Sequence, residues 1–310
     1  MALFARRVNN YDLYASHAWY VPGVKGMFGL LGLFLLGMLL GNMVVLIFSA
    51  FLPGEVVMTY STLIAYPLSF IPAMIYAGVK SQKNSLFEKG YKLSSNHFGP
   101  YNGWLVALIT VVLTYATMVV ADLPNYFNFK LTMSSPLMKQ IYDQFTAIMG
   151  SLTGGPFWSS FLLVAIFAPV FEEWLCRGMV LRGLLTKMKP AWAIVLSALF
   201  FAIIHANPWQ ALNAFIIGLV MGYVYYKTGS LWMTMLIHFI NNGTAVVVAQ
   251  VTDQPTTEAT FWVQEMAQSD YILFYAAGVC VFGLCCWLLS RIPMEQERGN
   301  IDEIPVSEEL

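Results

Sequence analysis

Residues 161–181 read FLLVAIFAPVFEEWLCRGMVL, an apolar run that carries two adjacent carboxylates and an arginine. A helix needs about 20 apolar residues to cross the hydrocarbon core of a bilayer, and this run is that long. A charge near the bilayer centre costs about 2.5–3.5 kcal/mol on insertion scales, so a retained charge usually faces a partner or water. The run therefore predicts a membrane-spanning helix whose Glu172 and Glu173 lie in a polar interior and not in lipid.

The composition of the whole chain points the same way. Hydrophobic residues make up 58% of the 310 residues and charged residues only 11%, whereas soluble domains are roughly one-quarter charged. We predict an all-α fold, a polytopic transmembrane helical bundle of about eight spans. The spans are expected near residues 27–51, 57–79, 103–122, 158–181, 190–206, 208–226, 231–250 and 270–290.

The positions of Lys and Arg test this count, because both collect in alternate, cytoplasmic loops when the number and order of spans are right. With the N-terminus inside, the following residues fall on the cytoplasmic side: Arg6, Arg7, Lys25, Lys80, Lys83, Lys89, Lys92, Arg177, Arg182, Lys187, Lys189, Lys227, Arg291 and Arg298. Of the 16 Lys and Arg, only Lys130 and Lys139 then fall outside. We expect a multi-pass protein of the cell membrane with both termini in the cytoplasm.

Three segments are predicted along the chain. A cytoplasmic N-terminal segment takes residues 1–26, a transmembrane helical domain takes 27–291, and an acidic cytoplasmic tail takes 292–310. Neither an internal repeat nor a stretch long enough for a separate soluble domain is apparent in the sequence.

The intramembrane charges are of two kinds. Arg177 lies four residues after Glu173, one helical turn away on the same face, so this pair is expected to have a structural role. Glu172 points about 100° away from that face on an ideal α-helix and has no such partner. Glu172 is therefore the first candidate for chemistry.

Two histidines also fall in predicted spans, and hairpin geometry places one of them level with Glu172. Glu172 and His205 each lie some sixteen positions from the turn expected at 187–190, roughly 24 Å at 1.5 Å per residue. His238 and Asn242 are four residues apart on a later span, so they face the same side of that helix. We expect these four side chains to meet in one polar site.

The four groups suit hydrolysis of an amide bond. A carboxylate and an imidazole within reach of one water molecule can take its proton as the water attacks a carbonyl, the roles expected for Glu172 and His205. An imidazole and a carboxamide can donate hydrogen bonds to the oxyanion that forms, the roles expected for His238 and Asn242. The predicted reaction uses activated water and no covalent intermediate.

Three motifs occur in order: E-E-x-x-x-R from Glu172 to Arg177, F-x-x-x-H from Phe201 to His205, and H-x-x-x-N from His238 to Asn242. In these motifs the chain resembles the CAAX protease and bacteriocin-processing family of intramembrane endopeptidases, with a family core at about 157–250. The resemblance implies catalytic roles for Glu172, His205, His238 and Asn242. It implies that Glu173, Arg177 and Phe201 shape the site.

The partners that follow from the resemblance are the lipid bilayer and a membrane-embedded or prenylated peptide or protein substrate, with no nucleic acid. No cofactor is expected. Zinc held by Glu172, His205 and His238 is an alternative, although the zinc signature H-E-x-x-H is absent. A thiol mechanism through Cys176 is a second alternative, disfavoured because an apolar setting works against the thiolate.

Two functions from other classes remain open at the level of sequence. Intramembrane Glu and His also serve proton relays, so a proton-coupled transporter would use the same residue types. A non-proteolytic membrane scaffold or immunity protein would hold a peptide in the same polar cavity without cleaving it. Proton or solute flux in proteoliposomes would favour the transporter, and a phenotype that survives Glu172→Ala would favour the scaffold.

Overall fold

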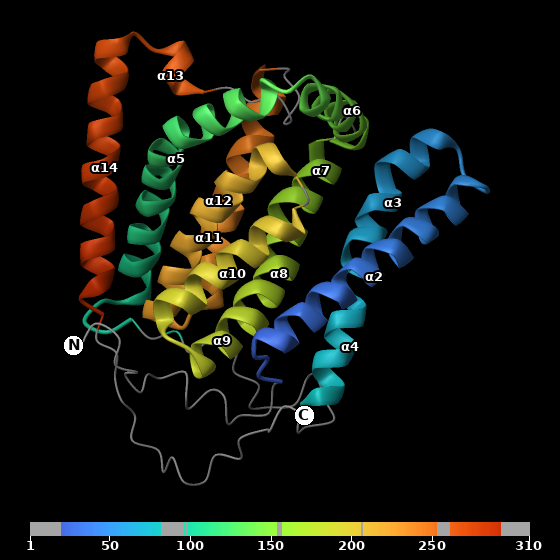
Figure 1. Ribbon diagram of the computed structural model, residues 1–310, viewed down its shortest axis with the longest axis horizontal. Helices are drawn as coiled ribbons and strands as arrows, with labels where there is room; N and C mark the ends of the chain where they lie inside the picture. Colours follow the sequence, from blue (N-terminus) through green and yellow to red (C-terminus); the bar gives the residue numbers. More distant parts are fainter. Residues whose placement is uncertain are drawn as a thin grey trace.

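The computed structural model describes residues 20–81, 96, 98–153, 157–205, 207–252 and 261–292. Over these residues the regular structure is helical and without strands, which confirms the predicted helical bundle (Figure 1). Most of the predicted N-terminal segment and nearly all of the acidic tail lie outside the described residues. The predicted segment boundaries therefore stay predictions.

The described part of the chain begins with three helices that form one side of the bundle in Figure 1: α2 (Val24–Ser49), α3 (Gly54–Leu68) and α4 (Ile71–Lys80). Two more follow, α5 (Gly103–Met133) and α6 (Pro136–Thr153). A composite helix over Phe157–Lys187 comes next; it consists of α7 (Phe157–Ser160), η1 (Phe161–Phe167), α8 (Ala168–Glu173), η2 (Trp174–Leu181) and α9 (Arg182–Lys187). The last helices are α10 (Pro190–Ile204), α11 (Pro208–Thr228), α12 (Leu231–Thr252), α13 (Trp262–Glu265) and α14 (Gln268–Ser290).

The predicted spans all coincide with helices. Among the described residues, six helical stretches are long and apolar enough to cross a membrane: Val24–Ser49, Tyr60–Lys80, Gly103–Met133, Phe157–Lys187, Leu231–Val251 and Gln268–Ser290. The predicted fifth span, α10, is apolar but only 15 residues long, and the sixth, α11, is not among these six stretches. The protein is thus an integral membrane protein with several spans.

Two of the basic residues assigned to the cytoplasmic side lie on a helix and not in an exposed loop. Arg177 and Arg182 both lie on the composite helix with side chains that are fully buried, and the side of the membrane predicted for them stays a prediction. The helix continues to Lys187, beyond the predicted end of the span, and its buried cations have hydrogen-bond partners. Arg182, for example, donates from Nε to the carbonyl oxygen of Gly178 and from Nη2 to that of Tyr20, each at 2.8 Å.

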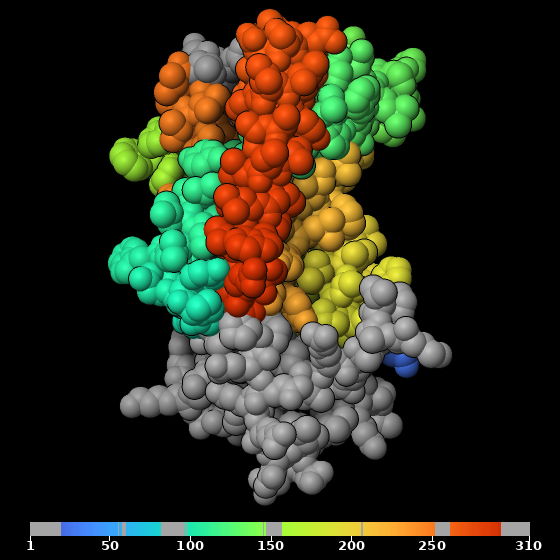
Figure 2. Space-filling view, turned by 90° about the vertical axis from the view of Figure 1, so that its left-hand side faces the viewer, coloured from blue at the N-terminus to red at the C-terminus, as the bar shows by residue number. Residues whose placement is uncertain are grey.

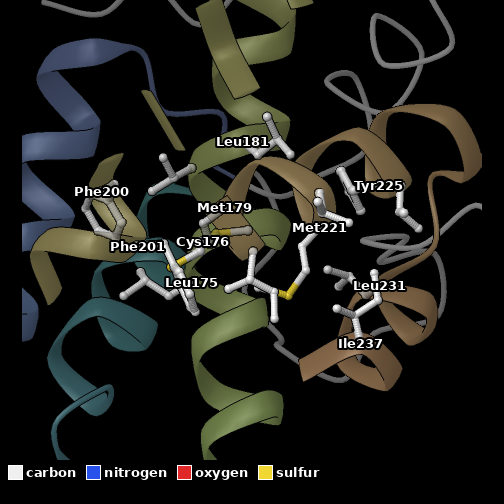
Figure 3. Packing of buried hydrophobic residues seen from close by; sticks show 14 of the residues in the cluster. Leu175, Cys176, Met179, Leu181, Phe200, Phe201, Met221, Tyr225, Leu231 and Ile237 are labelled. Atoms are coloured by element: carbon white, nitrogen blue, oxygen red, sulfur yellow. The ribbon is translucent and has the colours of Figure 1, made fainter. Parts of the chain in front are cut away.

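The composite helix, α10, α11 and α12 pack together in the interior of the bundle. Figure 3 shows the apolar cluster that joins them, with Cys176 and Met179 from η2, Phe201 from α10, Met221 from α11 and Ile237 from α12. On the side away from α2, α14 packs on α5 and runs down the middle of the coloured part of the face shown in Figure 2. α5 and α14 therefore cover one side of this group of helices.

Two glycines bring α2 close to the backbone of α3. A Cβ atom on Gly37 would lie 2.1 Å from the carbonyl oxygen of Ser69, and one on Gly41 would lie 2.7 Å from that of Ala65. Small residues four apart are a common device for close helix packing in membranes. The pair therefore fixes how α3 lies along α2, and α3 reaches the site described next.

Candidate active site

Two π-helical segments flank the adjacent carboxylates. Glu172 and Glu173 end α8, with η1 before it and η2 after it. Pro169, near the start of α8, has no N–H to donate to the preceding turn, and its ring crowds the carbonyl there, which favours a widened turn. π-Helical turns are rare and occur frequently at functional sites.

Glu172 lies between two imidazoles. Its Oε2 atom is 3.8 Å from Nε2 of His205 and 3.9 Å from Nε2 of His238. That oxygen is buried and has no hydrogen-bond partner among the described residues. The other oxygen, Oε1, accepts a hydrogen bond from the hydroxyl of Tyr66. The structure thus brings together three of the four residues to which the sequence assigned chemistry.

Glu173 belongs to a second, fully buried network. Its Oε1 atom is 2.7 Å from Nη1 of Arg177, four residues on, and 3.1 Å from Nδ1 of His238. Arg177 also donates from Nη2 to the carbonyl oxygen of Gly218 at 3.0 Å. His238 faces Glu173 through one ring nitrogen and Glu172 through the other, so the two carboxylates share one imidazole.

His205, which follows the last residue of α10, has a defined ring orientation. Its Nδ1 atom is 2.7 Å from the carbonyl oxygen of Phe201. A carbonyl oxygen only accepts, so Nδ1 carries the proton and, in the neutral ring, Nε2 presents a lone pair toward Glu172. Phe201 also packs its ring against both histidines, with centroids 4.6 Å from His205 and 5.4 Å from His238, and lies 4.5 Å under the guanidinium of Arg177.

Asn242 lies one turn beyond His238 on α12, and its hydrogen bonds connect it to η1. Its Nδ2 atom donates to the carbonyl oxygen of Val164 at 2.9 Å, and its Oδ1 atom accepts from Nδ2 of Asn241 at 3.0 Å. Among the described residues these bonds do not join Asn242 directly to Glu172 or His205. One of the two amide hydrogens is therefore engaged with backbone, and the second is left for another acceptor.

The zinc and thiol alternatives concern two different parts of the structure. In the described part of the chain, no group of three or more His, Cys, Asp or Glu side chains has the geometry to hold a metal ion. Zinc at Glu172, His205 and His238 stays a prediction that a chelator would test. Cys176 is a free, fully buried thiol inside the apolar cluster of Figure 3.

Sequence reasoning missed Tyr66. It comes from α3, 106 residues before Glu172, in a helix that carries none of the three motifs. A buried tyrosine hydroxyl usually needs a partner, but an isolated Tyr in an apolar stretch does not reveal which one. The contact is visible only once the helices are assembled.

A family model matches part of the chain. The family model of the type II CAAX prenyl endopeptidase Rce1-like proteins matches residues 154–244, a segment that contains Glu172, His205, His238 and Asn242. No curated protein and no solved structure matches the chain. The matched segment holds the composite helix, α10, α11 and the part of α12 that reaches the site. Residues 154–244 therefore carry a type II CAAX prenyl endopeptidase Rce1-like domain, and this match supports the resemblance to the CAAX protease family.

Proposed function

We propose that the protein is an intramembrane endopeptidase that hydrolyses a peptide bond of a membrane-associated or prenylated substrate with water activated by Glu172 and His205. The observation that carries the proposal is the buried Oε2 atom of Glu172, which has no hydrogen-bond partner in the described residues and faces two imidazole nitrogens. The Rce1-like match supports the reaction class and the membrane setting.

The distances suit one water molecule at the site. A direct hydrogen bond spans about 2.7–3.2 Å, whereas Oε2 of Glu172 is 3.8 Å from the Nε2 atom of His205. A polar separation of this size is commonly bridged by water. Such a water donates one hydrogen to the carboxylate and the other to the lone pair on Nε2, and its oxygen is left to attack.

The reaction then needs no covalent enzyme intermediate. The water oxygen bonds to the carbonyl carbon of the substrate while its proton passes to Glu172, which acts as general base. The tetrahedral intermediate collapses when the C–N bond breaks, and the proton held by the carboxyl group goes to the leaving amine. The products are a new carboxyl terminus and a new amino terminus.

His238 and Asn242 are proposed to donate to the oxyanion. The Nδ1 proton of His238 is directed at Glu173, so donation to an oxyanion must come from Nε2 and requires both ring nitrogens to be protonated. Asn242 keeps one amide hydrogen after bonding Val164. Donors held in place in this way stabilise the charge that develops in the transition state.

Glu173, Arg177 and Phe201 are proposed to hold these groups in place. The carboxylate of Glu173 fixes one nitrogen of His238, and Arg177 neutralises that carboxylate and ties it to the backbone of α11. The ring of Phe201 fills the space between both imidazoles and the guanidinium. This network explains how a buried charged set persists without lipid exposure.

The proposal is tested with purified protein in liposomes and a farnesylated peptide that ends in C-a-a-X, in water enriched in ¹⁸O. We expect a shortened, still farnesylated product whose new carboxyl group carries ¹⁸O, formed equally well with a chelator present. Loss of cleavage with the chelator and recovery with zinc would favour the zinc alternative. Proton flux without cleavage would replace the endopeptidase with a transporter.

The proposal also places both termini in the cytoplasm of a cell membrane, as the Lys and Arg distribution predicts. Labelling of a cysteine introduced before Tyr20 or after Ile292 by a membrane-impermeant reagent tests this orientation. We expect the introduced cysteine to be labelled in inside-out vesicles, which expose the cytoplasmic face, and not in intact cells.

A further inference from the structure

We propose that Tyr66 is a positioning residue for Glu172 and that the N-terminal helices therefore complete a site whose motifs all lie in the matched segment. This inference rests on the proposed function, because it assigns Tyr66 to the carboxylate that activates water. Tyr66 lies on α3, outside residues 154–244.

The first observation is the hydrogen bond itself. The hydroxyl of Tyr66 donates to Oε1 of Glu172, while Oε2 is the oxygen that faces the two imidazoles. A carboxylate on a flexible side chain can turn about its terminal bonds, and a donor on one oxygen restricts the plane of the group. Tyr66 thereby keeps the second oxygen directed at the place proposed for the attacking water.

The second observation is that Phe70, one helical turn after Tyr66, packs on the residue that precedes Glu172. Phe70, four residues after Tyr66, stacks on Phe171 with ring centroids 5.4 Å apart and an interplanar angle of 26°. The rings of Tyr66 and Phe70 are 5.5 Å apart. Two aromatic side chains one turn apart thus meet two successive residues of α8, Phe171 and Glu172. This paired contact sets both the depth and the rotation of α3 against α8.

The third observation is the way in which the backbone holds Tyr66 at that depth. Pro67 lies inside the last turn of α3, which ends at Leu68, and Phe70 precedes α4. The carbonyl oxygens of Ala65 and Ser69, on either side of Pro67, would lie only 2.7 Å and 2.1 Å from Cβ atoms added to Gly41 and Gly37. The close approach of α2 therefore supports the segment that presents the hydroxyl.

The role assigned to Tyr66 is to orient Glu172 and not to react. The hydroxyl already has an acceptor in Oε1, and the proton transfer proposed above passes through Oε2. Removal of the hydroxyl should slow the chemical step and leave substrate binding nearly unchanged. A purely structural tyrosine would instead affect folding or affect both kinetic parameters.

The test compares wild type, Tyr66→Phe and Tyr60→Phe in liposomes with the farnesylated peptide. Phenylalanine retains the ring that packs on Phe70. We expect kcat of Tyr66→Phe to fall on the order of 10- to 100-fold, as for loss of a hydrogen bond to a charged group, with KM within about threefold. Tyr60 lies on the same helix with 53% of its surface exposed, so Tyr60→Phe should match wild type. An unchanged kcat in Tyr66→Phe overturns the inference.

A second measurement does not depend on cleavage. Protein labelled with 3-fluorotyrosine is examined by ¹⁹F NMR, and the signal of residue 66 is the one lost in Tyr66→Phe. We expect Glu172→Ala to shift that signal and Glu265→Ala, on exposed α13, to leave it in place. An unshifted signal shows that Tyr66 does not contact Glu172 and overturns the inference. If wild type does not cleave the peptide, the proposed function fails for that substrate, while the NMR result still decides the contact.

Discussion

Two helical stretches long and apolar enough to span the membrane have different tasks. In the most apolar 18-residue stretch of α2, only 22% of the residues are buried. Large side chains of this helix, such as Leu46, are exposed. In the corresponding stretch of the composite helix Phe157–Lys187, 44% of the residues are buried. This helix also carries the buried charged side chains of Glu172, Glu173 and Arg177. Hydropathy identifies both as spans, whereas the buried charges separate the helix that holds the chemistry from the helix that faces lipid. The contribution of α2 comes through two glycines.

The largest effect on cleavage is expected from substitution of Glu172, which lies on the composite helix. Glu172→Gln keeps the shape of the side chain and an oxygen for Tyr66, but it removes the general base. Cleavage should fall by roughly 10²- to 10⁴-fold, the usual contribution of such a group, while thermal unfolding stays near that of wild type. Glu265→Gln, on the exposed surface of α13, is the matched control and should keep full activity.

A large loss of stability is expected when the buried ion pair of Arg177 and Glu173 is broken. Arg177→Met leaves Glu173 without its cation in a site with no exposed surface. Removal of one partner of a buried pair is destabilising by about 3–5 kcal/mol, so the midpoint of thermal unfolding in detergent should drop clearly. Arg291→Met, at an exposed position after α14, should change it little. Equal midpoints for the two variants would mean that the buried network does not hold the helices together.

A smaller effect on rate is expected from the oxyanion group. Asn242→Ala removes the amide hydrogen proposed to face the substrate and also the bond to Val164. Loss of one oxyanion donor lowers kcat by roughly 10²- to 10³-fold in other hydrolases. The measurement is kcat in liposomes at equal protein abundance, and a kcat within twofold of wild type would remove Asn242 from the mechanism.

The smallest effect is expected from Gly→Ala substitutions in α2. The expected change in stability has opposite signs at two positions of this helix. At Gly37 an added Cβ would meet the carbonyl oxygen of Ser69 at 2.1 Å, whereas at Gly32 nothing lies within 4 Å. Gly37→Ala should destabilise by about 1–3 kcal/mol through overpacking, and Gly32→Ala should be neutral or stabilise by up to about 1 kcal/mol through helix propensity. Thermal unfolding of the two variants checks this, and the same sign for both would contradict the packing of α2 on α3.

Much of the architecture could be predicted because lipid imposes simple rules. Apolar length placed every predicted span on a helix, and the depth of Glu172 and His205 in their hairpin followed from the rise per residue. The i, i+4 spacing also predicted the pair of Glu173 and Arg177, which the structure contains.

The remaining features depend on tertiary contacts that leave no local pattern. No local pattern indicated that both carboxylates would meet His238, Glu172 at Nε2 and Glu173 at Nδ1. Burial of Arg182 depends on a carbonyl from the N-terminal segment. Tyr66 reaches Glu172 from a helix that no motif marks. Each of these needs knowledge of which helices are neighbours.

The central claim, that Glu172 and His205 serve proteolysis, is tested most directly by mass spectrometry of membrane peptides and protein termini in cells. The cells carry wild type, Glu172→Gln or His205→Ala at equal abundance. We predict at least one cleavage product that is present with wild type and lost in both variants, and its sequence identifies the substrate. Identical termini in all three cell lines, with the phenotype of wild type retained, would contradict the account and favour a non-proteolytic role for the same polar site.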